Sequence, residues 1–141
     1  MKPKELYQST AWRYFSRYIL LAYSQDGVVK CCTCGKMDFI HSPNMHTGHF
    51  IKVSDAYATA FEPKNVGPQC LRCNHFRHGE EAKMAEWIEK THGEGTVEYL
   101  RIKSKNYCRL DKFTLTLLAK EFKKKFEELV KKKGHNPWKK R

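Results

Sequence analysis

The two stretches that decide the fold are Cys31-Cys32-Thr33-Cys34-Gly35 and Gln69-Cys70-Leu71-Arg72-Cys73-Asn74. Each contains a Cys-x-x-Cys pair, and two such pairs supply four thiolates to one tetrahedral Zn²⁺. Four sulfur ligands leave no open position, so the predicted ion is structural rather than catalytic. A redox pair or coincidental thiols explain less, because redox Cys-x-x-Cys motifs occur singly beside a strand–helix pattern. The predicted zinc ligands are Cys31, Cys34, Cys70 and Cys73.

The segment between the two pairs contains Gly48-His49, and Asn74 directly follows the second pair. A neutral imidazole can deprotonate a water molecule for attack on phosphorus, because its pKa lies near working pH. Phosphodiester cleavage also requires a divalent ion, and the Asn74 side-chain oxygen suits Mg²⁺ or Mn²⁺. His46, three residues before His49, is a candidate second ligand. The pattern predicts a hydrolytic site with His49 as base and with Asn74 and His46 holding catalytic Mg²⁺ or Mn²⁺.

Two more polar residues are candidates for the same site. Asn65 could tie down the intervening loop by bonding backbone amides. His78 follows Asn74 by four residues, so it would lie on the same side if a helix begins there. The remaining histidines lack such placement and are expected at the surface: His41, His75, His92 and His135.

Periodicity predicts a single α+β domain over residues 1–141. An N-terminal helix is expected over 9–26, capped by Ser9 or Thr10, followed by short strands at 28–30 and 37–40. Residues 41–69 carry little periodicity and are expected to be mostly loop, with a short extended piece at 49–51. The zinc-bound core spans 28–92 and includes a helix at 80–90. A C-terminal helical part spans 96–133, its last helix capped by Asp111 or Thr114, and a basic flexible tail follows at 134–141.

The chain of 141 residues carries a formal charge of +12, which indicates a polyanionic partner. Nucleic acid is the first candidate and an anionic membrane surface the second. The charge is concentrated at the end, where residues 120–141 hold nine Lys and one Arg against three Glu. A charge run is often only a solvated helix face, but this one is strongly one-sided. Predicted nucleic-acid contacts are Lys123, Lys124, Lys131, Lys132, Lys133, Lys139, Lys140 and Arg141.

The start of the chain, Met1 to Glu5, is polar and does not resemble a signal peptide, and the apolar patch at 18–23 is too short to span a bilayer. A reducing cytoplasmic location is therefore expected, where cysteines serve as metal ligands rather than disulfides. Cys32 could replace Cys31 as a ligand, although its spacing to Cys34 makes a poorer chelate. Cys108 has no partner motif and is expected to be a small core residue.

The two cysteine motifs, together with Gly48-His49-Phe50 and Phe61-Glu62-Pro63-Lys64-Asn65, resemble the phage NinG (Rap) recombination proteins, a branch of the HNH/endonuclease VII-like superfamily. The resemblance also takes in Gly79, and it covers most of residues 10–132. It implies a zinc-knuckle-stabilised ββα-metal (His-Me finger) core flanked by N-terminal and C-terminal helices. In that core a hairpin delivers the base, here His49, and the residue after the last cysteine, here Asn74, binds the catalytic ion.

The same resemblance implies a phage or prophage protein that acts on branched DNA, such as Holliday junctions and D-loops, in the bacterial host. The chain departs from the family pattern at two positions. The endonuclease VII-like pattern has an acidic residue directly before the base, where this chain has Gly48. NinG-like sequences have Asp at the position that His46 holds here, and a His ligand binds Mg²⁺ less well than Asp does.

Three hypotheses follow. The first is a divalent-metal-dependent, structure-selective DNA endonuclease, with a possible homodimer on a symmetric junction. The second is a non-catalytic zinc-knuckle protein that binds nucleic acid by charge and shape, which leaves Gly48-His49 and Asn74 without an evident use. The third, a zinc-stabilised protein-interaction adaptor, leaves the +12 charge unexplained.

Overall fold

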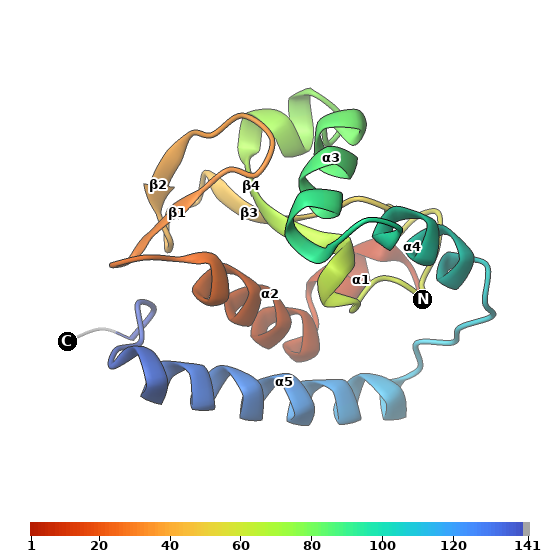
Figure 1. Ribbon diagram of the computed structural model, residues 1–141. Helices are drawn as coiled ribbons and strands as arrows, with labels where there is room; N and C mark the ends of the chain where they lie inside the picture. Colours follow the sequence, from red (N-terminus) through yellow and green to blue (C-terminus); the bar gives the residue numbers. More distant parts are fainter. Residues whose placement is uncertain (140–141) are drawn as a thin grey trace.

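The computed structural model describes residues 1–139 and shows a mixed α+β fold with two small antiparallel sheets. The elements follow in the order α1 (Pro3–Tyr7), α2 (Thr10–Tyr23), β1 (Val28–Lys30), β2 (Met37–Phe39), β3 (Met45–His49), the 3₁₀ turn η1 (Pro63–Asn65), β4 (Val66–Cys70), the π-helical turn η2 (Arg72–Phe76), α3 (Glu81–His92), α4 (Thr96–Ser104) and α5 (Lys112–Lys133). Helix α5 runs along one side of α2, and the sheets, α3 and α4 lie on its other side (Figure 1).

Helices α2 and α5 begin at residues whose side chains cap them. Ser9 Oγ accepts a hydrogen bond from the Trp12 amide at 3.1 Å and begins α2. Asp111 Oδ1 accepts one from the Thr114 amide at 2.8 Å and begins α5. Gly134, at φ +84°, ends α5 in the left-handed conformation typical of a helix end. Helices α2 to α5 thus lie where the sequence predicts helical structure, to within a few residues. Helix α1 was not predicted, because it is too short to show periodicity.

Helices α2 and α5 lie side by side and run in the same direction (Figure 1). Their apolar faces meet through aromatic side chains, with the Phe15 and Phe122 ring centroids 4.8 Å apart in an edge-to-face arrangement. Phe126 is also buried, and Leu118 and Val130 pack against the buried residues. The apolar stripe of the last helix therefore packs largely inside the chain, although the neighbouring Phe113 and Leu117 are exposed.

The two sheets are hairpins. Strand β1 pairs with β2, with Lys30 opposite Met37, and β3 pairs with β4, with Met45 opposite Cys70 and His49 opposite Val66. Residues 41–69 are mostly loop, as predicted, but they also contain β3 and most of β4. The extended piece lies at Met45–His49 rather than at 49–51, and β4 was missed because its Gly and Pro residues hide the strand pattern.

Strand β4 contains Pro68, which offers no amide proton to the strand ladder. The Pro68 carbonyl accepts a hydrogen bond from the Cys32 amide at 2.8 Å. This bond joins the loop after β1 to β4. The first cysteine pair is therefore held directly against the strand that carries Cys70.

Within residues 1–139, no helix is long and apolar enough to cross a bilayer.

Candidate active site and metal centre

Four cysteines from two turns form a compact cluster, in which all but Cys34 are buried. The Sγ atoms of Cys31, Cys34, Cys70 and Cys73 all lie within 4.8 Å of one another, and those of Cys34 and Cys70 are 3.6 Å apart. Tetrahedral zinc with Zn–S bonds of about 2.3 Å separates its sulfur ligands by roughly 3.8 Å. The cluster could therefore hold a structural zinc ion, with the ligands that the sequence predicts.

The pKa values of the clustered thiols also indicate that a bound cation is needed for all four to ionise. Burial opposes ionisation of the Cys31 thiol, yet hydrogen bonds from Thr33 and from nearby backbone amides lower its pKa to about 6. Burial raises the pKa of the Cys73 thiol to about 12. Four adjacent thiolates are therefore incompatible without a positive ion, because each charge disfavours the next.

Cys32 lies outside this cluster. Burial raises the pKa of its thiol, which packs beside Gly67. The alternative in which Cys32 replaces Cys31 as a ligand is thus not the arrangement that the structure has. Cys108 is half-buried against the cluster that contains Leu6 and Leu110.

His49 ends strand β3 and is only 3% exposed. Its Nε2 lies 2.9 Å from the carbonyl oxygen of Ala60. Because a carbonyl can only accept, Nε2 carries the proton and Nδ1 carries the lone pair. Burial lowers the pKa of His49 to about 4, and the positive charge of Lys52 acts in the same direction. The imidazole is therefore neutral at pH 7, with its basic nitrogen identified.

The basic nitrogen faces helix α1, which the sequence did not connect with it. The Tyr7 hydroxyl lies 3.2 Å from His49 Nδ1, and the Trp12 ring stacks on the imidazole with centroids 5.0 Å apart. Burial raises the pKa of Tyr7, so its hydroxyl stays protonated and donates to Nδ1. No local pattern signals these contacts, because they join segments far apart in the sequence.

His46 and Asn74 lie together on the same cavity. Asn74 Nδ2 is 3.3 Å from His46 Nδ1, and His46 Nε2 is 2.9 Å from the Pro43 carbonyl oxygen. The carbonyl fixes the proton on Nε2, so the His46 lone pair faces the Asn74 amide. Asn74 lies in the turn η2, directly after Cys73. A zinc ion bound by the four cysteines would therefore also restrain the position of Asn74. The His75 ring also packs against His46, 5.1 Å between centroids.

Asn65 does not line the cavity. Its side chain instead holds the loop between β3 and η1 through hydrogen bonds to the backbone. Its Oδ1 accepts from the Ile51 amide at 2.9 Å, and its Nδ2 donates to the carbonyls of Ile51 and Thr59 at 3.0 Å each. This loop contains Ala60, the partner of His49 Nε2. Asn65 therefore positions the base indirectly through the backbone.

The candidate residues line one cavity of about 790 Å³. The residues that sequence reasoning placed there are His46, His49, Asn74 and His78; those it did not are Tyr7, Trp12, Ser16, Met45, Thr47, Lys52, His75 and Glu81. His78 lies in a turn at φ +52° rather than on a helix, because α3 begins only at Glu81. Lys52 donates through Nζ to the His49 carbonyl at 3.2 Å, and burial lowers its pKa.

The missing acidic residue before His49 has a packing explanation. A Cβ added to Gly48 would lie 2.2 Å from Gln69 Oε1. Gln69 is fully buried and donates through Nε2 to the Gly79 carbonyl at 2.7 Å, so it cannot move aside freely. The position directly before the base therefore has no room for a side chain in this fold.

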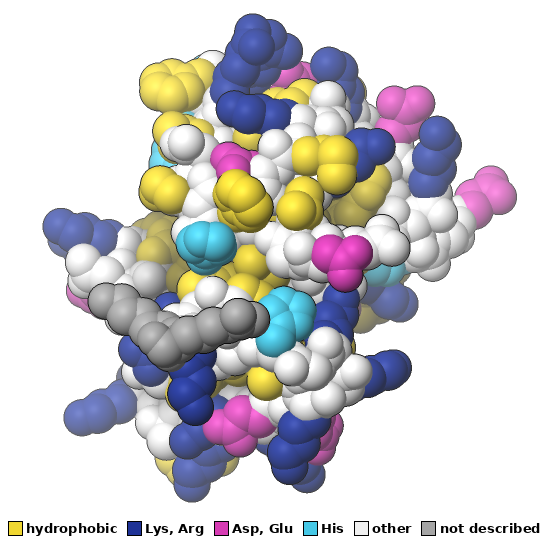
Figure 2. All heavy atoms as spheres, turned by 90° about the vertical axis from the view of Figure 1, so that its left-hand side faces the viewer, with side chains coloured by type: hydrophobic (Ala, Val, Ile, Leu, Met, Phe, Trp, Pro, Cys, Tyr) yellow, Lys and Arg dark blue, Asp and Glu magenta, His cyan; other side chains and the backbone are white. Residues whose placement is uncertain are grey.

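The predicted basic contacts are spread over the end of α5 and the segment beyond. Figure 2 shows Lys and Arg side chains around the margin of one face and gathered along its lower part, where α5 lies. Lys133 is half-buried, and its Nζ donates to the Ser24 carbonyl at 2.8 Å. The exposed residues are Lys123, Lys124, Lys131, Lys132 and Lys139, whereas Lys140 and Arg141 fall outside the described part of the chain.

Three comparisons bear on this site. No curated protein and no solved structure matches the chain. A family model described as NinG, Bacteriophage Lambda NinG protein, matches residues 1–133. The matched region contains both cysteine pairs, His46, His49 and Asn74.

Proposed function

Since this chain belongs to the NinG family of phage proteins, we propose that it is a divalent-metal-dependent DNA endonuclease of the His-Me finger type. The single observation that carries the proposal is the state of His49. Its Nε2–H is bound to the Ala60 carbonyl, and its Nδ1 lone pair faces the cavity that Asn74 and His46 also line. A neutral, oriented imidazole in one cavity with two potential metal ligands suits general-base catalysis of phosphodiester hydrolysis.

In the reaction, His49 takes a proton at Nδ1 from the attacking water. The hydrogen bond from Tyr7 must open first, because its hydroxyl donates to the same lone pair. Ala60 then stabilises the imidazolium that forms, since its carbonyl already holds the Nε2 proton. The stacked Trp12 ring keeps the imidazole plane in place during the transfer.

Asn74 and His46 fit a divalent ion. The His46 lone pair points to the Asn74 amide at 3.3 Å. Exchanging the oxygen and nitrogen of that amide by a flip of the side chain turns its oxygen toward the same point. When bound, Mg²⁺ or Mn²⁺ supplies positive charge to a nonbridging oxygen and to the leaving 3′ oxygen. Lys52 adds a fixed positive charge on the cavity wall for the scissile phosphate.

Branched DNA is the proposed substrate, as in Holliday junctions and D-loops. The charge of +12 supports a DNA partner, and the exposed lysines of α5 would contact phosphates on its arms without reading sequence. A symmetric four-way junction would suit two active sites, and hence a homodimer.

One observation favours a second function, a non-catalytic zinc-knuckle protein that binds nucleic acid. The base is 3% exposed, and its lone pair already accepts a hydrogen bond from Tyr7. If the hydrogen bond between the Tyr7 hydroxyl and His49 Nδ1 does not open, His49 cannot activate water, and the protein would bind DNA by charge alone. This alternative predicts DNA binding without cleavage in the presence of either ion.

The test uses the zinc-loaded protein with an end-labelled synthetic four-way junction and a linear duplex of matched sequence. Each is incubated with Mg²⁺, with Mn²⁺ or with EDTA. We expect junction cleavage that needs the ion and that His49→Ala abolishes, with zinc content, circular dichroism and junction binding retained. His135→Ala, at the exposed end of the chain, is the matched control and should cut normally. Tight binding to the junction without cleavage in the presence of either ion would reject the endonuclease hypothesis and support the non-catalytic binding protein.

A further inference from the structure

We propose that a hollow along helix α2, marked by Arg13 and Arg17, binds the phosphodiester backbone of the DNA strand that continues from the His49 cavity. The proposal rests on the proposed function, because it takes DNA to be the partner of that cavity. It adds a binding surface distinct from the lysines of α5.

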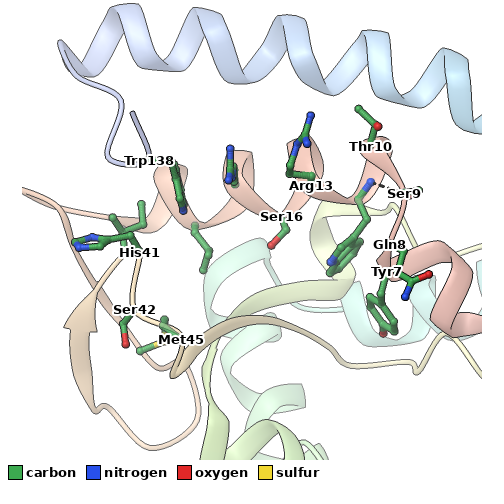
Figure 3. Close-up of a pocket in the computed structure, with 14 residues that line it drawn as sticks. Tyr7, Gln8, Ser9, Thr10, Arg13, Ser16, His41, Ser42, Met45 and Trp138 are labelled. Atoms are coloured by element: carbon green, nitrogen blue, oxygen red, sulfur yellow. Dashed lines mark hydrogen bonds between the residues drawn. The ribbon is translucent and has the colours of Figure 1, made fainter. Parts of the chain in front are cut away.

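The hollow adjoins the His49 cavity. It has a volume of about 380 Å³ and shares Tyr7, Trp12, Ser16 and Met45 with its larger neighbour. Figure 3 shows its labelled side chains on separate segments of the chain. Tyr7 ends α1 and is followed by Gln8 and Ser9, Arg13 and Ser16 lie on α2, His41 and Ser42 lie between β2 and β3, Met45 begins β3, and Trp138 follows α5. A strand bound at one cavity therefore meets the other without leaving the surface.

The charge of the hollow has one sign. Among the described residues, no Asp or Glu lines it, whereas Arg13, Arg17 and His41 do. Within residues 1–139, neither arginine has an ion-pair partner or a side-chain hydrogen bond. Burial lowers the pKa of Arg17, and the neighbouring charge of Arg13 lowers it further. Two guanidinium groups one helical turn apart repel each other, and an anion bound between them would relieve that repulsion.

Arg17 is held in a shape that suits a phosphate. Its guanidinium carbon lies 5.3 Å from the centre of the Trp138 ring. Trp138 is anchored in turn by Phe126, with centroids 5.8 Å apart. This contact restrains the guanidinium group, whose N–H groups can contact phosphate oxygens in a bidentate way. Arg13 lies over the Tyr14 ring at 5.3 Å in a similar way.

The two cavities meet at a polar junction that is itself ordered. Ser16 Oγ lies 2.9 Å from Thr47 Oγ1, and Thr47 Oγ1 donates to the Ser16 carbonyl at 3.2 Å. These bonds tie α2 to the strand that carries His49. The position of the arginines relative to the base is therefore fixed, so phosphates on Arg13 and Arg17 would set which bond of the strand reaches His49.

The test measures DNA binding without cleavage, by fluorescence anisotropy of a labelled four-way junction with the zinc-loaded protein, without added Mg²⁺ or Mn²⁺, over a range of NaCl. The variant Arg13→Ala/Arg17→Ala is compared with Lys105→Ala/Arg109→Ala, which removes the same charge from the exposed connection between α4 and α5. We expect the first variant to lose roughly tenfold or more in affinity, and its log–log salt slope to fall by about 1 to 2. The control should stay within about twofold of the parent protein.

Equal losses of affinity in the two double variants, or no loss of affinity in the first, would overturn the proposed role of the hollow while leaving DNA binding in place. A parent protein that binds no DNA would instead overturn the proposed function together with this one. Arg17→Lys keeps the charge but not the flat fork, and we expect an intermediate loss if the contact is bidentate. Zinc content and circular dichroism establish that each variant is folded, so a weakened affinity reports the contact itself.

Discussion

The Tyr7 hydroxyl lies 3.2 Å from Nδ1 of His49, so the first helix of the chain covers the only unprotonated nitrogen of the candidate base. The contact joins residues 42 positions apart and depends on Leu6, a fully buried residue of the same helix. Access to the base is thus set by α1, a five-residue helix.

Tyr7→Phe should increase the rate of junction cleavage. The variant keeps the ring that packs on Trp12 at 5.0 Å but removes the hydroxyl that competes with the attacking water. A hydrogen bond of about 1 kcal/mol corresponds to an increase of about fivefold. Single-turnover cleavage rates measure this, with Tyr107→Phe at an exposed site as control. A strong loss of rate in a folded variant would mean that Tyr7 takes part in the reaction.

Cleavage should persist to unusually low pH for a histidine base. His49 is neutral above its pKa of about 4, so the rate should hold as pH falls through 6.5 and decline only near 4. The measurement is the pH profile of the single-turnover rate with saturating ion. A midpoint near 6.5 would contradict the buried, unprotonated state of His49.

The same pKa makes a prediction for stability. The unfolded chain binds a proton at His49 below about 6.5, whereas the folded chain does so only below about 4. The free energy of unfolding should therefore fall as pH drops from 6.5 to 4, by up to about 3 kcal/mol for this group. Denaturant titrations of the parent and of His49→Gln, which cannot titrate, isolate the effect. Parallel pH dependences in the two proteins would refute it.

His46→Asp should shift ion preference from Mn²⁺ toward Mg²⁺. The His46 lone pair faces Asn74, and a nitrogen ligand favours Mn²⁺ over Mg²⁺ relative to a carboxylate. Calorimetric titration of both ions into the zinc-loaded protein, dialysed free of Mg²⁺ and Mn²⁺, measures the change. Asn44→Asp, at an exposed position just before β3 and outside the cavity lining, is the control for added charge. An equal shift in both variants would indicate a general electrostatic effect rather than ligation by His46.

Gly48→Ala should destabilise the protein by about 1 to 3 kcal/mol, because the new methyl group would overlap Gln69 Oε1. Gly48→Ala/Gln69→Ala should regain part of that loss by removing the overlapping atoms. Chemical denaturation of the two single variants and the double variant gives the coupling between them. Additive effects would show that the two side chains do not collide.

Zinc removal should unfold the centre of the chain rather than only slow a reaction. Cys31, Cys70 and Cys73 lie in the same buried cluster as Leu21 and Val29, so losing the ion removes the bonds that would hold the two cysteine turns together in the core. Cys70→Ser should reproduce the effect of a strong chelator in circular dichroism.

The matched control is Cys108→Ser, which lies outside the metal cluster and should leave zinc content and melting unchanged. A folded, zinc-free Cys70→Ser protein would contradict a structural role for the ion.

The sequence by itself determined the features that depend on near neighbours. Helix caps such as Ser9 and Asp111 act within three residues, and each Cys-x-x-Cys turn presents its own two thiols. Helices α2 and α5 and the cysteine ligand set could be predicted on that basis, whereas α3 and α4, which have no side-chain cap, and the hairpin of β1 and β2 were predicted from the local pattern of apolar residues. The grouping of His46, His49 and Asn74 also followed, because the two cysteine pairs bracket the histidines and fix Asn74.

Only the tertiary structure decided the rest. Strand β4 is recognisable by its pairing with β3, since Gly67 and Pro68 carry no strand signal of their own. The placement of Tyr7 over His49, the close approach of Gln69 to Gly48, and the joining of the α2 hollow to the His49 cavity all depend on segments distant in sequence. Such contacts form only when burial of the common core brings the segments together, so no local propensity encodes them.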